Sequence, residues 1–160
     1  MTQHIFSSNR TVKCLTLHQP YASLVACGRK RIETRPRKLN HRGLLAIHSS
    51  RSDVFMGKCE SPEFITAADE EEYLQNLPKG MVLAVCNMTG CFQFDDRFLA
   101  SKDPLISLTD EERAFGDYRL GRWGYILEDV HPLKTPISTR GYQGLWDWQA
   151  PDDLDNLLEW

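Results

Sequence analysis

The stretch QPYASLVACGRKRIETR, residues 19–35, contains the features that decide the predicted fold. Pro20 is typical of a first helical turn, residues 22–27 continue the helix, and Gly28 is typical of its end. In residues 31–35, RIETR, β-branched residues alternate with charged ones, which is the pattern of a half-exposed strand. The stretch therefore predicts a short helix, a turn and a strand.

Further strands are predicted on both sides of this stretch. Residues 12–17 and 44–50 have the apolar runs of buried strands. Residues 81–94 are strongly β-forming, with a bulge or bend expected at Gly90. Residues 123–130 are another candidate strand.

Two more segments carry helix signals. Residues 63–77 contain a capping-box spacing and end at a Pro-Lys-Gly sequence. Residues 108–116 repeat the capping signal with Thr109 and Glu112. Residues 140–146, RGYQGLW, are predicted to form a glycine-punctuated loop.

These elements predict the fold class. Several strands, few helices and no regular alternation of strand and helix indicate an α+β domain with a mainly antiparallel sheet. So many short strands in one small domain are compatible with a partly closed barrel. The chain of 160 residues fits one domain, residues 1–160, with a core at about 12–148.

Charge is distributed unevenly. The net charge of -3 argues against a protein that coats nucleic acid by bulk electrostatics. The acids gather in residues 69–72, in residues 110–112 and near the C-terminus, whereas one short span is strongly basic. That span indicates either a solvated edge strand or a local anion-binding face. Its cations are Arg29, Lys30, Arg31, Arg35, Arg37, Lys38 and Arg42, opposed only by Glu33.

The cysteines and the N-terminus give expectations about metals and compartment. The odd count, with no C-x-x-C pair and no spacing to histidines, predicts no metal site, no cofactor and mostly buried, reduced thiols. Residues 1–10 have no apolar core of signal-peptide length, and no segment approaches a membrane span. A cytoplasmic protein without membrane association is expected. The cysteines are Cys14, Cys27, Cys59, Cys86 and Cys91.

The basic span resembles the signature of the ASCH domain, a member of the PUA-like superfamily. The family pattern Gly-x-Lys-x-x-Glu-x-Arg is met by Gly28, Lys30, Glu33 and Arg35. RGLLAIHSS, YILEDVHPL and RGYQGLWDW are similar to the family's later segments, so the resemblance covers most of the chain. It implies a β-barrel with helices packed outside and a cleft beside the signature. It also implies RNA or nucleic-acid binding, although some family members are enzymes acting on RNA or modified nucleosides.

Lys30 and Glu33 each allow more than one role. Lys30 would neutralise the helix end, or reach a phosphate or a base carbonyl. Glu33 would accept from a base amino group, act as an acid or base, or hold Lys30 and Arg35 in place. In a regular strand, Arg31, Glu33 and Arg35 share one face, so Lys30 meets Glu33 only if Lys30 lies in the preceding turn.

A hydrolase in the same cleft is the alternative to a binding module. The candidate catalytic residues are Lys30, Glu33 and His48, and a metal-independent ribonuclease would draw on Lys30, Arg35, His48 and Ser49. For His48, a core histidine bonded to the backbone is the favoured interpretation over a catalytic role. An acetylcytidine amidohydrolase is less supported, because relatives of that kind carry a threonine nucleophile where Glu33 stands. Thr34 is predicted to face the other way.

The expected ligand is single-stranded RNA or a nucleotide, with single-stranded DNA as an alternative and protein partners left open. Tyr21 and Tyr142 are the candidates for stacking on bases, while Trp146 and Trp148 are expected in the core. An acidic helix at residues 69–72 leaves room for an adaptor role, although a solvated face explains it as well. The candidate nucleic-acid-binding residues are Gln19, Tyr21, Arg29, Lys30, Arg35, Arg37, Arg42, Ser49, Arg140 and Tyr142.

Overall fold

A computed structural model describes residues 10–52, 76–95 and 108–160 of the chain. The predicted helix at 63–77, with its capping pair Thr66 and Asp69, lies outside these ranges except for its last residues. The elements in chain order are β1 (Arg10–Leu17), α1 (Tyr21–Ala26), β2 (Ile32–Arg35), β3 (Gly43–Ser49), β4 (Met81–Gln93), α5 (Asp110–Arg113), β5 (Trp123–Ser138), β6 (Leu145–Ala150) and the 3₁₀ helix η2 (Leu154–Leu157).

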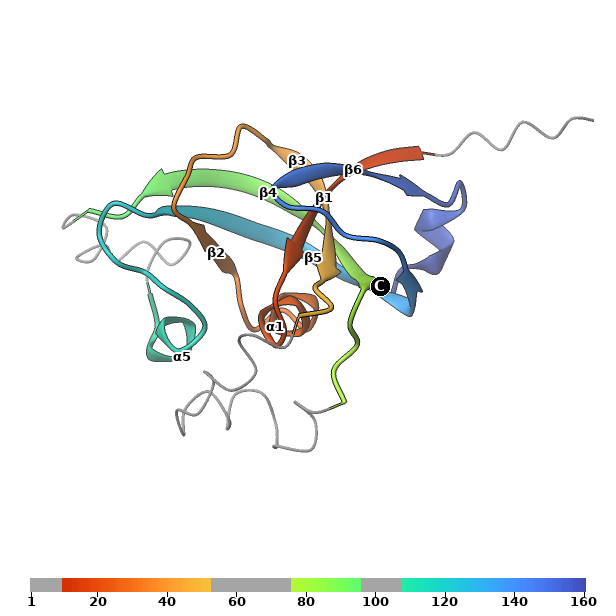
Figure 1. The fold of residues 1–160 in the computed structure, drawn as a ribbon, viewed down its shortest axis with the longest axis horizontal. Helices are drawn as coiled ribbons and strands as arrows, with labels where there is room; N and C mark the ends of the chain where they lie inside the picture. Colours follow the sequence, from red (N-terminus) through yellow and green to blue (C-terminus); the bar gives the residue numbers. More distant parts are fainter. Residues whose placement is uncertain (1–9, 53–75, 96–107) are drawn as a thin grey trace, which may run out of the picture.

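The strands form one six-stranded sheet in the order β2-β5-β4-β3-β1-β6. Among the described strands, β1 and β3 run parallel and every other neighbouring pair is antiparallel. The prediction of an α+β fold with a mainly antiparallel sheet is therefore confirmed. Figure 1 shows the sheet curving above α1, with α5 near β2.

The sheet is not closed into a barrel by strand pairing within the described residues. Its edges are β2 and β6, which do not pair with each other in this part of the chain. Strand β6 pairs with β1 only over Arg10–Leu15, which leaves Thr16 and Leu17 beyond the end of that pairing. The predicted barrel closure is thus not seen, and an opening remains between β2 and the end of β1.

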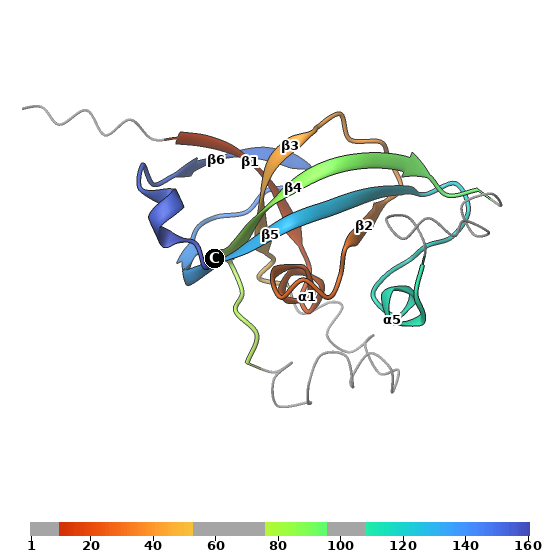
Figure 2. The ribbon, with the colours of Figure 1, turned by 180° about the vertical axis from the view of Figure 1, so that it is seen from behind.

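Apolar side chains of alternating strand positions build a core on each face of the sheet. On one face, Leu15 and Leu17 pack with Ala22 and Val25 of α1. On the other face, Val12 and Cys14 pack with Leu154 of η2 and other C-terminal residues. Figure 2 shows α1 beneath the sheet and η2 at the end remote from α5. Each face of β1 is therefore covered, which explains its apolar run.

Several local predictions are confirmed. Helix α1 ends at Ala26 with Cys27 as its C-cap, and Gly28 follows with a φ of 79°, a conformation that suits glycine. The pairing of β4 with β5 shifts register between Met88 and Gly90, as expected for a bulge. The Thr109 side chain accepts a hydrogen bond from the Glu112 N–H at the start of α5.

Other predictions about strands are wrong. Strand β5 begins at Trp123 as predicted but ends at Ser138 and not at residue 130, and its register with β4 shifts along this extension. The end of the predicted loop 140–146 already belongs to β6. Strand β2 is not half-exposed, since Glu33 and Thr34 are buried together with Ile32.

The described cysteines are free thiols. Cys14 and Cys86 are buried, whereas Cys91 is half-buried and Cys27 is exposed; Cys59 lies outside the described residues. Burial raises the pKa of both buried thiols, that of Cys86 to about 12, so neither is a nucleophile near neutral pH. No helix of the described part of the chain is long and apolar enough to cross a membrane.

Candidate functional site

A cavity of about 1100 Å³ lies beside the signature, at the opening between β2 and the end of β1. Residues 16–18 of β1 and its exit form one wall, and residues 33–36 form another. The loop at 140–144 forms a third. Cations outnumber carboxylates in the described lining, so the cavity favours an anion. Its charged residues are Lys30, Arg35, Arg51, Arg122 and Arg140, against Glu33 and Asp117.

Lys30 lines this cavity and is 1% exposed. It precedes β2, and its Nζ donates to the Ile32 carbonyl at 2.7 Å and to the Tyr118 hydroxyl at 3.1 Å. The Nζ also lies 3.9 Å from Glu33 Oε2. Lys30 is therefore in the turn that a joint Lys-Glu site requires. Burial lowers the pKa of Lys30, while the charges of Glu33 and Glu112 oppose that shift.

Glu33 lies between two cations. Arg35 Nε is 3.2 Å from Glu33 Oε1, close enough for an ion pair, but its N–H is not aligned for a hydrogen bond. Lys30 is too distant for one as well. Within the described residues, the carboxylate therefore has two ion pairs and no hydrogen bond, so it retains acceptor capacity toward the cavity.

Arg35 crosses the opening of the sheet. Its Nη2 donates to the carbonyl of Thr16 at 2.9 Å, joining β2 to the part of β1 that β6 leaves unpaired. Because both residues line the cavity, this bond forms part of its wall. Arg35 thus has a structural contact in addition to its charge.

Glu112 of α5 supports the site from outside the cavity lining, and the sequence reasoning missed this role. Its carboxylate is buried and accepts from the backbone N–H groups of Arg31 and Ile32, each at 3.0 Å. The Tyr118 hydroxyl donates to it at 3.0 Å and accepts from Lys30. The capping signal located Glu112, but in a capping box its side chain would turn back to its own helix. Instead it satisfies the start of β2, and nothing in the local sequence reveals that partner.

Arg122 and Asp117 line the cavity without having been predicted. Arg122 Nε donates to the Asp117 carbonyl at 3.0 Å, and its Nη2 donates to the Thr34 carbonyl at 3.3 Å. Thr34 borders the cavity together with Glu33, although alternation predicted opposite faces for them. The Arg119 and Arg122 side chains hold the pKa of Asp117 below its usual range, so it remains a carboxylate.

His48 is held by hydrogen bonds on both ring nitrogens. Nε2 lies 3.0 Å from the Thr139 carbonyl, which only accepts, so Nε2 carries the proton. Trp146 Nε1 donates to Thr16 Oγ1 at 3.0 Å, which leaves the Thr16 hydroxyl to donate to Nδ1 at 3.2 Å. Burial lowers the pKa of His48, in agreement with a neutral ring. This arrangement favours the interpretation as a core histidine.

The loop at 140–144 packs closely on His48. A Cβ on Gly141 would collide with the His48 ring and would approach Thr16 Oγ1 to 2.9 Å, so this approach requires glycine. Beyond it, Arg140 lies over the Tyr142 ring at 5.3 Å, and Tyr142 contacts Trp146 edge to face at 5.4 Å. Tyr142 is 52% exposed, so its ring is accessible for stacking. Of the two predicted core tryptophans, Trp148 is buried and Trp146 is half-buried.

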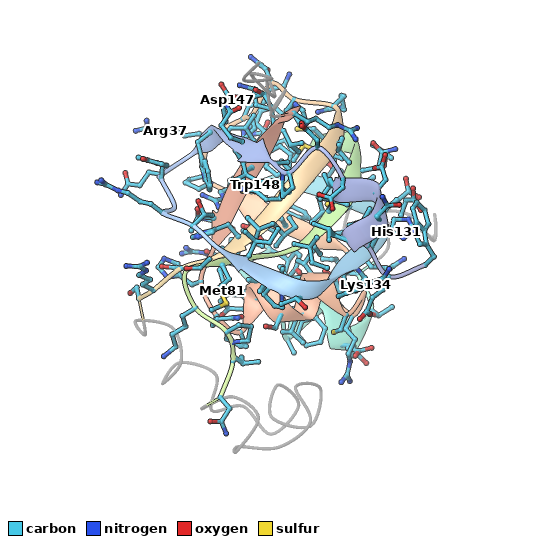
Figure 3. All side chains as sticks on the ribbon, turned by 90° about the vertical axis from the view of Figure 1, so that its right-hand side faces the viewer. Arg37, Met81, His131, Lys134, Asp147 and Trp148 are labelled. Carbon is cyan, nitrogen blue, oxygen red and sulfur yellow. The ribbon has the colours of Figure 1, made fainter. Side chains whose placement is uncertain are left out.

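The structure brings some predicted residues to the cavity and not others. Gln19 is buried, donating to the Pro78 carbonyl and accepting from the Ser23 N–H, and Ser49 is buried against Met81. Arg29 pairs with Glu111 at 2.8 Å. Arg37 and Arg42 are exposed outside the cavity, and Figure 3 shows Arg37 at the edge of the molecule. The predicted residues that line the cavity are Tyr21, Lys30, Glu33, Arg35, His48, Arg140 and Tyr142.

The described residues also address the expectation about metals. No group of three or more His, Cys, Asp or Glu side chains among them could hold a metal ion.

Comparison with known proteins identifies the family. The model of the ASCH domain matches residues 15–132, so the chain belongs to the ASCH domain family. It is 31% identical over 97 residues to activating signal cointegrator 1 of Mus musculus, covering 53% of this chain and 16% of that protein. The chain thus spans a small part of the curated relative that it matches.

Solved structures share the fold. A crystal structure of a mutant ASCH protein from Zymomonas mobilis has a TM-score of 0.55 and 16% identity, covering 94% of this chain and all of that chain. A crystal structure of ASCH from Zymomonas mobilis has a TM-score of 0.53 and 15% identity, covering 92% of this chain and 95% of that one. At these identities the similarity concerns the fold.

Proposed function

We propose that this ASCH domain binds single-stranded RNA, or a nucleotide of it, in the cavity beside the signature. The observation that carries the proposal is the Glu33 carboxylate, which is buried and free of hydrogen bonds within the described residues. The charged groups around it in the cavity are mostly cations. A phosphate site alone gains nothing from a carboxylate, whereas a base amino group needs such an acceptor.

The lining supports a division of the cavity between the parts of a nucleotide. Arg51 and Arg140 line the cavity from other segments of the chain and would offer donors to phosphate oxygens. Glu33 would accept from the edge of the base, and Tyr21 or Tyr142 would stack on its face. Single-stranded RNA fits this geometry better than duplex, because an unpaired base can be splayed into a cavity. Single-stranded DNA is the alternative polymer.

The contacts support binding more than hydrolysis. A catalytic base must have a free, unprotonated nitrogen or oxygen within reach of its substrate. Both His48 nitrogens are engaged within the protein, and Lys30 already donates to Ile32 and Tyr118. Of the three candidate catalytic residues, Glu33 keeps a free oxygen toward the cavity. A metal-independent ribonuclease therefore remains the alternative function. An amidohydrolase is less supported than a ribonuclease, because Glu33 stands in place of the threonine nucleophile.

Binding of a fluorescein-labelled pool of random hexaribonucleotides tests the proposal, measured by anisotropy in chelator at several salt concentrations. We expect Arg140→Ala to weaken binding and to reduce the salt slope by about one. Lys134→Ala is the matched control, because Lys134 is also an exposed cation but lies far from Arg37 and outside the cavity lining (Figure 3).

Two outcomes would contradict the proposal. Binding that does not depend on salt concentration would contradict the phosphate contacts. Equal weakening of binding by Arg140→Ala and Lys134→Ala would contradict the cavity as the binding site. A denaturing gel of the same samples reports cleavage. Intact RNA is expected, and fragments formed in chelator would establish the ribonuclease instead.

A further inference from the structure

The loop between β2 and β3, residues 36–42, carries cations outside the cavity. Arg37, Lys38 and Arg42 are exposed on it, and the loop follows directly from Arg35, which lines the cavity. We call residues 36–42 the basic loop. A free nucleotide held in the cavity would leave these cations without a phosphate to contact.

The backbone of the basic loop is fixed by a core residue. The Tyr125 hydroxyl donates to the Arg37 carbonyl at 2.8 Å and accepts from the Leu39 N–H at 2.6 Å. The Tyr125 ring is fully buried in the core cluster on the α1 face. The loop therefore presents its cations from a defined backbone position, which reduces the entropy lost when they bind.

An aromatic ring lies beside these cations. Trp123 packs partly against the core, and Lys38 Nζ lies 5.2 Å from the centroid of its ring. Trp123 is also the residue directly opposite Arg35 in the pairing of β2 with β5. Arg35, which borders the cavity, is thus paired with Trp123, and Lys38 lies over the Trp123 ring.

We infer that the basic loop and Trp123 form a second contact surface, so that the ligand is a single strand of several nucleotides and not a free nucleotide. This inference rests on the proposed function of the cavity. One nucleotide occupies the cavity, the neighbouring phosphates pass Arg35 to the basic loop, and the next base stacks at Trp123 where Lys38 now lies. Cations interleaved with an aromatic ring are the usual means of holding a single strand.

Two ligands of different length distinguish binding at the second surface from binding in the cavity. Calorimetric titrations are made with random hexaribonucleotides and with an equal mixture of the four nucleoside 5′-monophosphates. The variants are Trp123→Leu and the double substitution Lys38→Ala with Arg42→Ala. The double substitution changes only exposed side chains, so it tests the surface even if Trp123→Leu does not fold. Lys134→Ala is the control of equal charge type.

We expect the wild type to bind the hexamers at least roughly tenfold more tightly than the monophosphates, and both variants to lose about three- to tenfold in hexamer affinity. Their affinity for the monophosphates should stay within about twofold of wild type. Unchanged hexamer affinity of the variants, or equal losses of affinity for hexamers and monophosphates, would overturn the second surface. Binding of the monophosphates by the wild type would still support the cavity as a nucleotide site. Failure of the wild type to bind either ligand would overturn the proposed function and this inference together.

Discussion

Arg35 and Thr16 join the two strands that strand pairing leaves apart. The Arg35 guanidinium donates to the Thr16 carbonyl at 2.9 Å, from the edge strand β2 to the end of β1 beyond its pairing with β6. In a closed barrel, backbone hydrogen bonds would fill this position. Here a side chain spans it, and the cavity lies at the same opening.

Replacing Arg35 should therefore affect both stability and binding. We expect Arg35→Met to lower the free energy of unfolding by about 1.5–3 kcal/mol, as for loss of a hydrogen bond from a charged group. Arg35→Lys keeps the charge but cannot reproduce the guanidinium geometry, so it should recover RNA affinity more than stability. Urea unfolding and anisotropy measure the two effects. Full recovery of stability by lysine would show that charge alone matters at this position.

Losing the Glu112 side chain should cost more unfolding free energy than losing the cap of α5, the helix that carries it. Glu112→Ala removes the acceptor for two buried backbone N–H groups at the start of β2, and we expect it to cost about 3 kcal/mol of unfolding free energy. Thr109→Ala removes the cap of α5 and should cost about 1 kcal/mol. Urea denaturation of both variants makes the comparison. Equal costs would mean that Glu112 serves α5 and not β2.

These contacts show where sequence reasoning reached its limit. The strands β1, β3 and β4 and the end of α1 follow from local patterns, because apolar runs, glycine and caps act on near neighbours. The burial of β2 does not follow from local patterns, because its contacts are distant in sequence: Glu112, about 80 positions away, bonds the Ile32 N–H, and Phe94 and Tyr118 pack with the Ile32 side chain. The same holds for the burial of Lys30, because its hydroxyl partner Tyr118 lies 88 positions away.

The site was predicted in part for the same reason. The signature placed Lys30, Glu33 and Arg35 together, since all lie within one turn and one short strand. Tyr118, Asp117 and Arg122 come from a segment with no recognisable motif. His48 was singled out by its position at a strand end, but its Thr16 and Thr139 partners depend on how β1 and the residues after β5 meet.

Gly141 should be required for the position of the cavity loop. In Gly141→Ala the added methyl group collides with the His48 ring, so the loop carrying Arg140 and Tyr142 must move. We expect RNA affinity to fall about tenfold, because a displaced Tyr142 no longer stacks on a base. The urea midpoint should change little, because the loop is exposed. Thr139→Ala is the control, since Thr139 contacts His48 through its backbone carbonyl. Unchanged affinity of Gly141→Ala would show that the loop does not hold the ligand.

Stability should fall as the solution is acidified through the range of histidine titration. The folded-state pKa of His48 lies below its ordinary value of 6.5, mainly through burial, so the unfolded chain binds the proton more readily. The stabilisation is complete above pH 6.5 and is lost progressively below it. Burial and Arg35 lower the pKa of His18 in the same direction.

Melting temperatures at about pH 7.5 and about pH 5.5 test this, compared between the wild type and His48→Gln. The variant should show a smaller difference between the two pH values, whatever its melting temperature at the higher one. An identical difference in both proteins would show that His48 does not contribute to the loss of stability in acid.

The most direct test of the central claim is to locate bound RNA on the protein. Ultraviolet crosslinking of a 4-thiouridine-containing hexaribonucleotide, followed by peptide mass spectrometry, reports which aromatic residues touch a base. Trp160 is an internal control, since it is 86% exposed and lies by His131 away from the cavity. We predict crosslinks at Tyr21 or Tyr142 that are lost in Arg140→Ala. Crosslinks at Trp160 with none at the cavity tyrosines would contradict the account.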